Sequence, residues 1–198
     1  RLMAAQFVKA YRKNSAVKND RQDAEAIATA ARQGNMRFVS VKTEEQQARL
    51  SWHRVREGYK KDSLAVMNRI RGLLSEFGIV IGQSAVALRR ALADLESVSL
   101  PPEFVQLVRL QQRYWEAIDA CQLACDTRIK AHADQDERCQ RIRGLTGVGP
   151  LTADAMVATL GNAVDFKNGR QCAAWMGLTP SQFGTGGRVQ LGRISCRG

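Results

Sequence analysis

The chain has 198 residues, of which 44% are hydrophobic, and its 30 basic and 19 acidic side chains give a net charge of +11. That hydrophobic fraction is ordinary for a folded protein and excludes a wholly disordered chain. No run of about 18 apolar residues occurs, which excludes a membrane-spanning helix. The excess of positive charge indicates a polyanionic partner, and nucleic acid is the first candidate.

The basic residues gather toward the two ends of the chain. Residues 1–18 carry five basic and no acidic side chains, and residues 166–198 carry the same balance. A protein that contacts phosphates with both ends would have this distribution, and so would a solvated basic surface. The chain begins at Arg1 instead of Met and stops after a polar, glycine-rich run. We therefore expect a fragment of a longer protein.

The first 42 residues predict short elements of both kinds. Residues 1–12 are expected to be extended around Phe7 and Val8. Residues 20–32 are rich in Ala, Gln, Glu and Arg and are closed by Gly34, which predicts a helix. Residues 36–42 alternate and contain β-branched side chains, which predicts a short strand or an extended connector.

Two long helices are predicted next, separated by a less regular segment at 80–100. From Thr43 to about Phe77 apolar residues recur at steps of three, four or seven, and residues 43–46 have the pattern of a capping box. After Pro102 a heptad seam runs to about Lys130. Its members are Phe104, Leu107, Gln111, Tyr114, Ile118, Cys121 and Cys125. The pair predicts an antiparallel coiled-coil arm over 43–136, with a stand-alone helical bundle as the alternative.

Beyond Arg138 glycines and small residues become frequent and acids nearly vanish. This change predicts a boundary near 137–140 and a small, compact helical C-terminal domain over 137–198, with residues 1–42 as a separate N-terminal part. The cysteines form no CxxC pair and have no flanking His at ligand spacing, so we expect reduced thiols in a cytoplasmic protein and no zinc site. They are Cys121, Cys125, Cys139, Cys172 and Cys196.

The first candidate site is the pair Asp20 and Asp23, which a helix would place on one face about one turn apart. Two carboxylates so placed can share a hard divalent cation, as phosphoryl-transfer sites require. Acids in the first turn after an Asn or Asp cap are also a common way to begin a helix. Two carboxylates cannot build a two-metal site unaided, so further acids would have to come from elsewhere.

The second candidate lies at residues 144–153, where a helix ending at Gly144, a Gly-Val-Gly turn and a helix from Pro150 match a helix-hairpin-helix pattern. Gly147 and Gly149 would let a partner approach the backbone, and amides near Thr152 would face a DNA phosphate without reading sequence. An ordinary tight turn between helices is the alternative.

The third candidate is the C-terminal run that follows the helical segment near Trp175. We expect a flexible, glycine-rich, basic loop, in which the hydroxyl of Thr185 could attack or bind a phosphate. Most lone Ser and Thr residues in loops only form turns. The basic residues expected to contact DNA here are Lys167, Arg170, Arg188, Arg193 and Arg197.

Taken in this order, five segments resemble the DEDD insertion-sequence transposases related to the Piv invertase. They are residues 18–27 (KNDRQDAEAI), 35–49 (NMRFVSVKTEEQQAR), 147–158 (GVGPLTADAMVA), 166–180 (FKNGRQCAAWMGLTP) and 191–198 (LGRISCRG). The resemblance implies a RuvC-like α/β domain, here represented only by its C-terminal remnant, and a C-terminal domain with a nucleophilic serine, joined across a coiled coil. The implied fold class is mainly α.

The resemblance also implies a mechanism and partners. Asp20 and Asp23 would be the two closing carboxylates of a metal-binding tetrad that holds Mg²⁺ during DNA cleavage and rejoining, and the first two acids would lie upstream of Arg1. The implied partners are the DNA of the element ends and target, in some relatives a guide RNA from the element, and further copies of the chain bound through the coiled coil.

One motif departs from the family pattern. Members usually have Ser-Ser-Gly-Gly or Ser-Thr-Gly-Gly where this chain has Gly-Thr-Gly-Gly at 184–187. If the nucleophile aligns with Gly184 it is lost, and if it aligns with Thr185 a β-branched hydroxyl remains. The chain alone is therefore expected to be a defective transposase. The alternatives are a non-catalytic helix-hairpin-helix DNA-binding protein and a structural coiled-coil scaffold.

Overall fold

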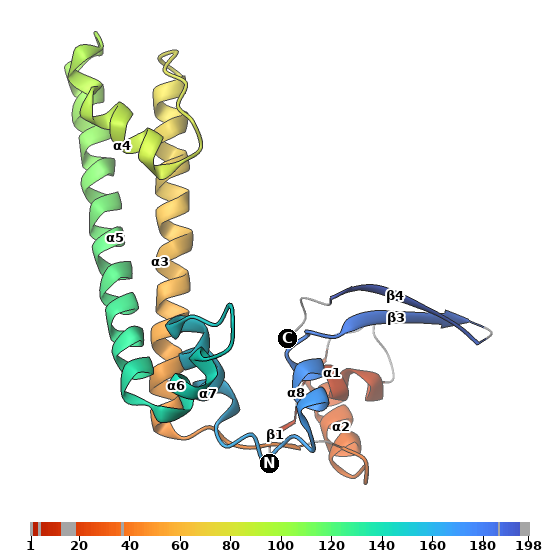
Figure 1. Ribbon diagram of the computed structural model, residues 1–198. Coiled ribbons are helices and arrows are strands. Elements are labelled where there is room, and N and C mark those ends of the chain that lie inside the picture. Colours follow the sequence, from red (N-terminus) through yellow and green to blue (C-terminus); the bar gives the residue numbers. More distant parts are fainter. Residues whose placement is uncertain (1, 4, 13–18, 37, 186, 195–198) are drawn as a thin grey trace. The chain divides into compact units, whose positions relative to one another are not determined.

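The computed structural model describes residues 2–3, 5–12, 19–36, 38–185 and 187–194 (Figure 1). The chain forms two compact units. Residues 43–160 make up one, called the helical unit below, and residues 1–42 together with 161–198 make up the other, called the terminal unit. Helices dominate the described residues, as the sequence predicted. None of the described helices is long and apolar enough to cross a membrane.

The helical unit is built on a hairpin of two long antiparallel helices, α3 (Glu44–Ser75) and α5 (Pro102–Gln135) (Figure 1). Helix α3 begins as predicted, because the Thr43 side chain accepts a hydrogen bond from the Gln46 backbone N–H while the Gln46 side chain accepts one from the Thr43 backbone N–H. Helix α5 begins at Pro102, where the missing N–H costs nothing.

The connection at 80–100 is more regular than predicted. It contains α4 (Ala85–Ala93), capped by the Ser84 side chain, and the 3₁₀ turn η2 (Leu95–Ser97). These elements close the far end of the hairpin over the main hydrophobic core. The buried members of that core are Val66, Ile70, Leu74, Leu88, Leu92, Leu95, Val108, Trp115 and Ile118.

The predicted seam of α5 is wrong at alternate positions. Leu107, Tyr114 and Cys121 are exposed, whereas Val108 and Trp115 are buried against α3. Predicted and observed seams share Phe104, Gln111, Ile118 and Cys125. The prediction therefore has the right period, but the second seam position of each heptad lies one residue later than predicted. The reason is that α5 is apolar on two adjacent faces, and only contact with α3 decides which face is covered.

At the near end of the hairpin, α6 (Glu137–Arg143) and α7 (Pro150–Leu160) pack against α3 and α5. A second, smaller core forms there from Ala133, Cys139, Ala153 and Val157. Residues 137–160 therefore belong to the same compact unit as the hairpin, and the expected domain boundary near 137–140 does not separate the units. The short connection after Gln135 is the physical reason, because it folds α6 and α7 back onto the long helices.

The N-terminal part of the terminal unit consists of β1 (Leu2–Met3), α1 (Ala5–Val8), the 3₁₀ turn η1 (Lys9–Tyr11), α2 (Asp20–Ala31) and β2 (Phe38–Val39). Strands β1 and β2 pair antiparallel. The predicted helix at 20–32 is present, and the strand expected at 36–42 is reduced to two residues. The expectation that residues 1–12 are extended is wrong beyond Met3, because Ala5 to Tyr11 form helical turns that pack against α2.

The C-terminal part contains α8 (Gly169–Trp175), β3 (Pro180–Thr185) and β4 (Arg188–Ile194). The prediction of a flexible loop is wrong, because β3 and β4 pair antiparallel with Thr185 opposite Arg188. The C-terminal region is therefore not purely helical. Within the terminal unit, Ser40 Oγ donates a hydrogen bond of 2.7 Å to the Asp165 carboxylate. Four of the cysteines lie in the described part and are free thiols, and Cys196 lies outside it.

Candidate functional site

The start of α2 carries the two predicted carboxylates. Asp20 and Asp23 both lie in its first turn, and the Asn19 side chain caps the helix by accepting a 3.0 Å hydrogen bond from the Arg21 backbone N–H. The cap is therefore Asn19 and neither acid. Asp20 is exposed, while Asp23 is half-buried and forms an ion pair of 3.0 Å with Arg12. No group of three or more metal-ligating side chains occurs in the described part of the chain.

The helices predicted on either side of the glycine turn at 144–149 are present. Gly144 ends α6, Gly147 has a φ of +88°, and Pro150 is the first residue of α7. A positive φ favours glycine, which explains that residue at this turn. Gly147, Gly149 and Thr152 are all exposed. The first amides of α7 have no carbonyl partner within the helix, so they remain available to an acceptor from outside.

The basic residues of the C-terminal part are exposed. Lys167 precedes α8, Arg170 lies on it, and Arg188 and Arg193 lie on β4. None of these four side chains forms an ion pair with another described residue, so their charges are open to solvent or to an anion. Arg197 lies outside the described residues.

Thr185 is the last residue of β3, and only its backbone is described. At the neighbouring Gly184, an added Cβ would lie 3.1 Å from the Arg188 carbonyl oxygen, which is tighter than ordinary contact. The close approach of the two strands therefore favours glycine at position 184. The only hydroxyl in the Gly-Thr-Gly-Gly run is that of Thr185.

Sequence reasoning missed a buried polar cluster where α3, α5, α6 and α7 meet. Asp154 of α7 is fully buried, and its carboxylate accepts hydrogen bonds from Arg49 Nε at 3.0 Å and from the His53 ring at 2.8 Å. The Arg49 guanidinium also donates to Asp136 at 2.8 Å and to the Cys139 sulfur at 3.5 Å. Arg49 of α3 thus contacts α7, α6 and the junction between α5 and α6.

The cluster holds its acids ionised. Burial acts to raise the pKa of Asp154, but hydrogen bonds from His53 and Arg49 outweigh it and hold that pKa below its ordinary value. Hydrogen bonds from Arg138 and then Arg49 hold the pKa of Asp136 far below its ordinary value, against the effect of burial. Burial raises the pKa of the Cys139 thiol, so this cysteine is a protonated core residue.

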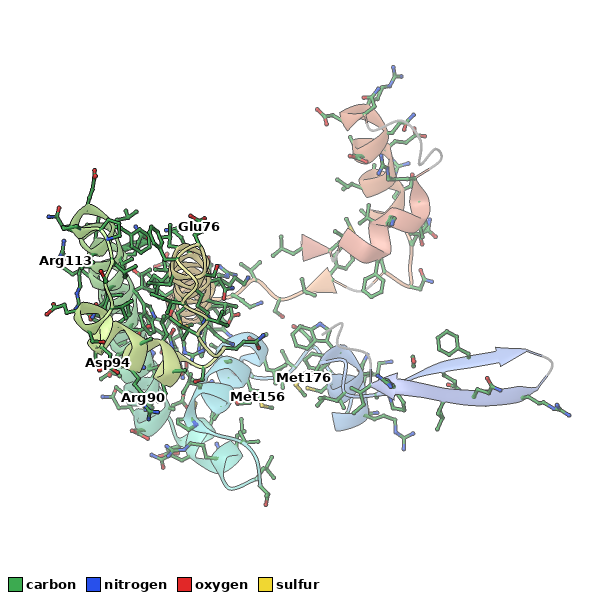
Figure 2. The ribbon with its side chains drawn as sticks, turned by 90° about the horizontal axis from the view of Figure 1, so that it is seen from above. Glu76, Arg90, Asp94, Arg113, Met156 and Met176 are labelled. Carbon is green, nitrogen blue, oxygen red and sulfur yellow. The ribbon has the colours of Figure 1, made fainter. Side chains whose placement is uncertain are left out.

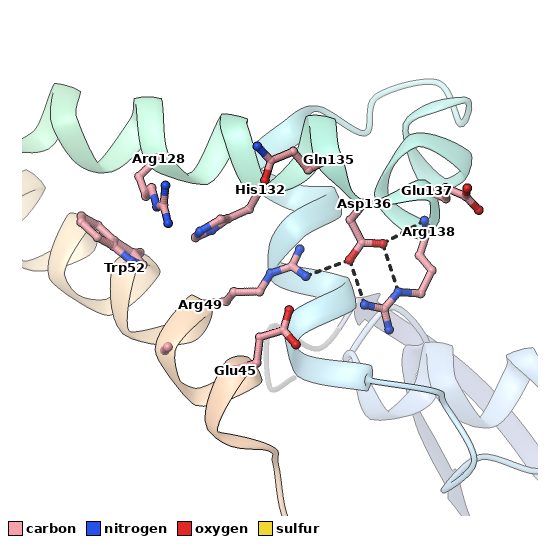
Figure 3. Close-up of a pocket in the computed structure, with 10 residues that line it drawn as sticks. Glu45, Arg49, Trp52, Arg128, His132, Gln135, Asp136, Glu137 and Arg138 are labelled. Atoms are coloured by element: carbon pink, nitrogen blue, oxygen red, sulfur yellow. Dashed lines mark hydrogen bonds and ion pairs between the residues drawn. The ribbon is translucent and has the colours of Figure 1, made fainter.

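A pocket of about 560 Å³ opens beside this cluster, between α3, α5 and the start of α6 (Figure 3). Trp52 and Arg49 line it from α3, Arg128 and His132 from α5, and Asp136 from the N-cap of α6. One signal in the sequence points to this end of the hairpin. Asp154 is the single charged residue of the largely apolar α7, and an acid in such a helix needs a buried partner.

Comparisons with known proteins agree on one family. Residues 139–198 match a family model described as "Transposase IS116/IS110/IS902 family", and residues 1–79 match the model DEDD_Tnp_IS110, described as "Transposase". No solved structure matches the chain.

Curated relatives align with the whole of this chain. A probable family 20 transposase of Pseudomonas aeruginosa is 43% identical over 202 residues, and this chain covers 59% of it. The transposase for insertion sequence element IS1111A of Coxiella burnetii is 38% identical over 202 residues, with 54% of its length covered. The transposase for insertion sequence element IS1328 of Yersinia enterocolitica is 35% identical over 199 residues, with 59% covered. The chain thus spans little more than half the length of these relatives.

The two family models match complementary parts of the sequence, and the relatives align from its first residue to its last. On these grounds, the chain belongs to the IS116/IS110/IS902 family of transposases.

Proposed function

We propose that this chain is part of an insertion-sequence transposase that binds DNA and supplies two of the carboxylates for metal-dependent strand cleavage and rejoining. The observation that carries the proposal is the start of α2, where Asp20 and Asp23 share the first turn and Asn19 performs the capping. The acids are not needed to begin the helix, which leaves them open to a second role.

The donor chemistry at α2 fits a hard divalent cation. Mg²⁺ prefers carboxylate oxygens and binds through one or two of them, keeping several waters. Asp20 and Asp23 would hold the ion, which would neutralise charge that develops on the attacked phosphate. Arg12 competes for Asp23 through their ion pair, so the loaded site requires that contact to be exchanged or shared.

The C-terminal residues would contribute the nucleophile and hold the DNA. Thr185 is proposed to supply the hydroxyl that attacks a backbone phosphate, since position 184 is a glycine. Arg188, Arg193 and Arg170 are exposed and free of acidic partners among the described residues, as a phosphate-binding surface requires. The exposed α7 N-terminus at Gly149 and Thr152 would add backbone amides as further phosphate donors.

The 198-residue chain is proposed to bind DNA without cleaving it. Two carboxylates cannot complete a two-metal site, and the family's remaining acids would lie in the part of the relatives that this chain does not cover. A DNA-binding protein with no catalytic role is the second candidate, and it is favoured if Asp20 and Asp23 bind no metal.

Self-association is proposed through the uncovered face of α5. An unbroken apolar seam with steps of three and four runs along this face and is exposed throughout. Its members are Leu107, Leu110, Tyr114, Ala117, Cys121 and Ala124. This spacing is that of a coiled-coil contact, and a second copy of the hairpin would offer the matching seam. Strand exchange needs two DNA ends held together, which a dimer would provide.

The metal proposal is tested by paramagnetic line broadening. Mn²⁺ added to the isotope-labelled chain is expected to broaden the backbone amide signals of residues 20–24. The double variant Asp20→Asn/Asp23→Asn should lose the broadening, whereas Glu44→Gln, which removes an acid from the first turn of α3, should keep it. Broadening that is absent, or that survives the double substitution, would reject the metal role, and the spectrum itself reports whether each variant folds.

A further inference from the structure

The pocket beside the buried cluster is lined only by residues of the helical unit, which contains neither the proposed carboxylates nor the C-terminal basic residues. Ten side chains line it, from α3, α5 and the start of α6, and its volume of about 560 Å³ lies in the range of small-ligand sites. Its wall is preorganised, because Arg49 and Arg138 are both held by the Asp136 carboxylate (Figure 3). A rigid wall lowers the cost of binding a ligand.

The charges of the pocket suit a single phosphate at most and do not suit a cluster of phosphates. Three arginines and three acids line it, and Asp136 engages both Arg49 and Arg138. The remaining charges are Arg128, Glu45 and Glu137, none of which has an ion-pair partner among the described residues. A site with one uncommitted cation and two uncommitted acids would repel a bare phosphate cluster. It favours a ligand whose buried part is neutral but rich in donors and acceptors.

The other walls provide contacts for a flat, polar ring. The indole of Trp52 is 38% exposed and faces the pocket from α3, while Arg128 approaches from α5 (Figure 3). His132 lies beside them, and its Nδ1 is buried without a hydrogen-bond partner among the described residues. The amide of Gln135 adds both a donor and an acceptor. An aromatic face together with unpaired donors and acceptors is the equipment with which proteins bind unstacked bases.

We propose that this pocket binds one unpaired nucleobase of a DNA or RNA strand. The base stacks on the Trp52 indole, its edge hydrogen-bonds to His132 and Gln135, and Arg128 contacts the adjoining backbone phosphate. This inference rests on the proposed function only in that a DNA-processing protein encounters unpaired strands. It needs neither Asp20 nor Asp23, and it assigns a nucleic-acid contact to the helical hairpin, which holds none of the three candidate sites indicated by the sequence.

The test uses the full 198-residue chain and short single strands, one of DNA and one of RNA, each with a central 2-aminopurine. Stacking on Trp52 is expected to quench the 2-aminopurine fluorescence. Trp52→Ala should abolish the quenching and weaken binding roughly ten-fold or more, the effect expected for loss of one stacked base. Trp52→Phe should retain most of both, which separates loss of stacking from loss of folding. The strand that is quenched identifies the source of the base, and quenching of either supports the proposal.

A second pair of variants controls for the loss of positive charge from the two long helices. Arg128→Ala should weaken binding more than Arg54→Ala, which removes an exposed arginine of α3 outside the pocket. Equal effects of these two variants, or binding without quenching, would overturn the pocket assignment. The two proposals fail separately: manganese broadening at α2 with no quenching rejects only the pocket, and quenching with no broadening rejects only the metal site.

Discussion

Arg49 and Asp154 form the most deeply buried ion pair in the described part of the chain, and their contact joins the long helix α3 to α7. The Asp154 side chain is fully buried, and the exposed fraction of the Arg49 side chain is 9%. The pair has its remaining hydrogen-bonding needs met by His53 and Asp136. Such full satisfaction is what allows two charges to remain inside a protein.

The variant Asp154→Asn is expected to lower the free energy of unfolding by about 3 kcal/mol, because it leaves the buried Arg49 with Asp136 as its only acidic partner among the described residues. Urea denaturation followed by circular dichroism measures the change. The matched control is Glu96→Gln, which breaks the solvent-exposed pair with Arg109 and should cost less than about 1 kcal/mol. Equal losses in the two variants would show that burial adds nothing to the Asp154 contact.

The stability of the helical unit should fall as the pH drops below neutrality, and His132 should cause part of the fall. Burial lowers the pKa of His132; the charge of Asp154 opposes this, and those of Arg128 and Arg49 add to it. Between that lowered pKa and the unfolded value of about 6.5, the unfolded chain binds more protons, so stability rises with pH across this window. His132→Gln should flatten the dependence in the window just below about pH 6.5, measured by urea denaturation at several pH values. An unchanged slope would contradict the assignment.

The elements themselves could be predicted from the sequence where local chemistry decides them. The Thr43 and Gln46 capping pair fixed the start of α3, and Pro150 after the glycine turn fixed that of α7. The sequence did not show which of the two apolar faces of α5 is buried. Val108 and Leu107 are adjacent and similarly apolar, and only the position of α3 makes one of them buried and the other exposed.

The C-terminal hairpin and the polar pocket were missed for two different reasons. Gly186 and Gly187 stand between the segments that form β3 and β4, and two adjacent glycines are a known hairpin signal as well as a common feature of flexible loops. The pocket depends on contacts across long sequence separations, such as the 105 residues between Arg49 and Asp154. No local pattern contains that pairing, although the lone acid in α7 indicates that it has a buried partner elsewhere in the chain.

Self-association should depend on the exposed seam of α5. Tyr114 lies at its centre and is 51% exposed, so Tyr114→Glu is expected to convert the associated species to a monomer by placing a charge in the apolar contact. Leu123→Glu is the control, since Leu123 is 64% exposed on the same helix but lies off the seam. Sedimentation velocity separates the outcomes. A wild-type chain that is monomeric, or a dimer that resists Tyr114→Glu, would exclude this interface.

DNA binding should depend on β4 more than on total charge. The double variant Arg188→Ala/Arg193→Ala is expected to weaken duplex binding, and to reduce the slope of log affinity against log salt by about 2, since each lost phosphate contact removes about 0.9 from it. The control Arg54→Ala/Arg113→Ala removes the same charge from exposed positions of the helical unit. Fluorescence anisotropy over a salt series gives both slopes. If the two double variants lower the slope equally, DNA binding depends only on the net charge of the chain. If the β4 variant alone lowers it, the exposed strand is the surface that holds the phosphates.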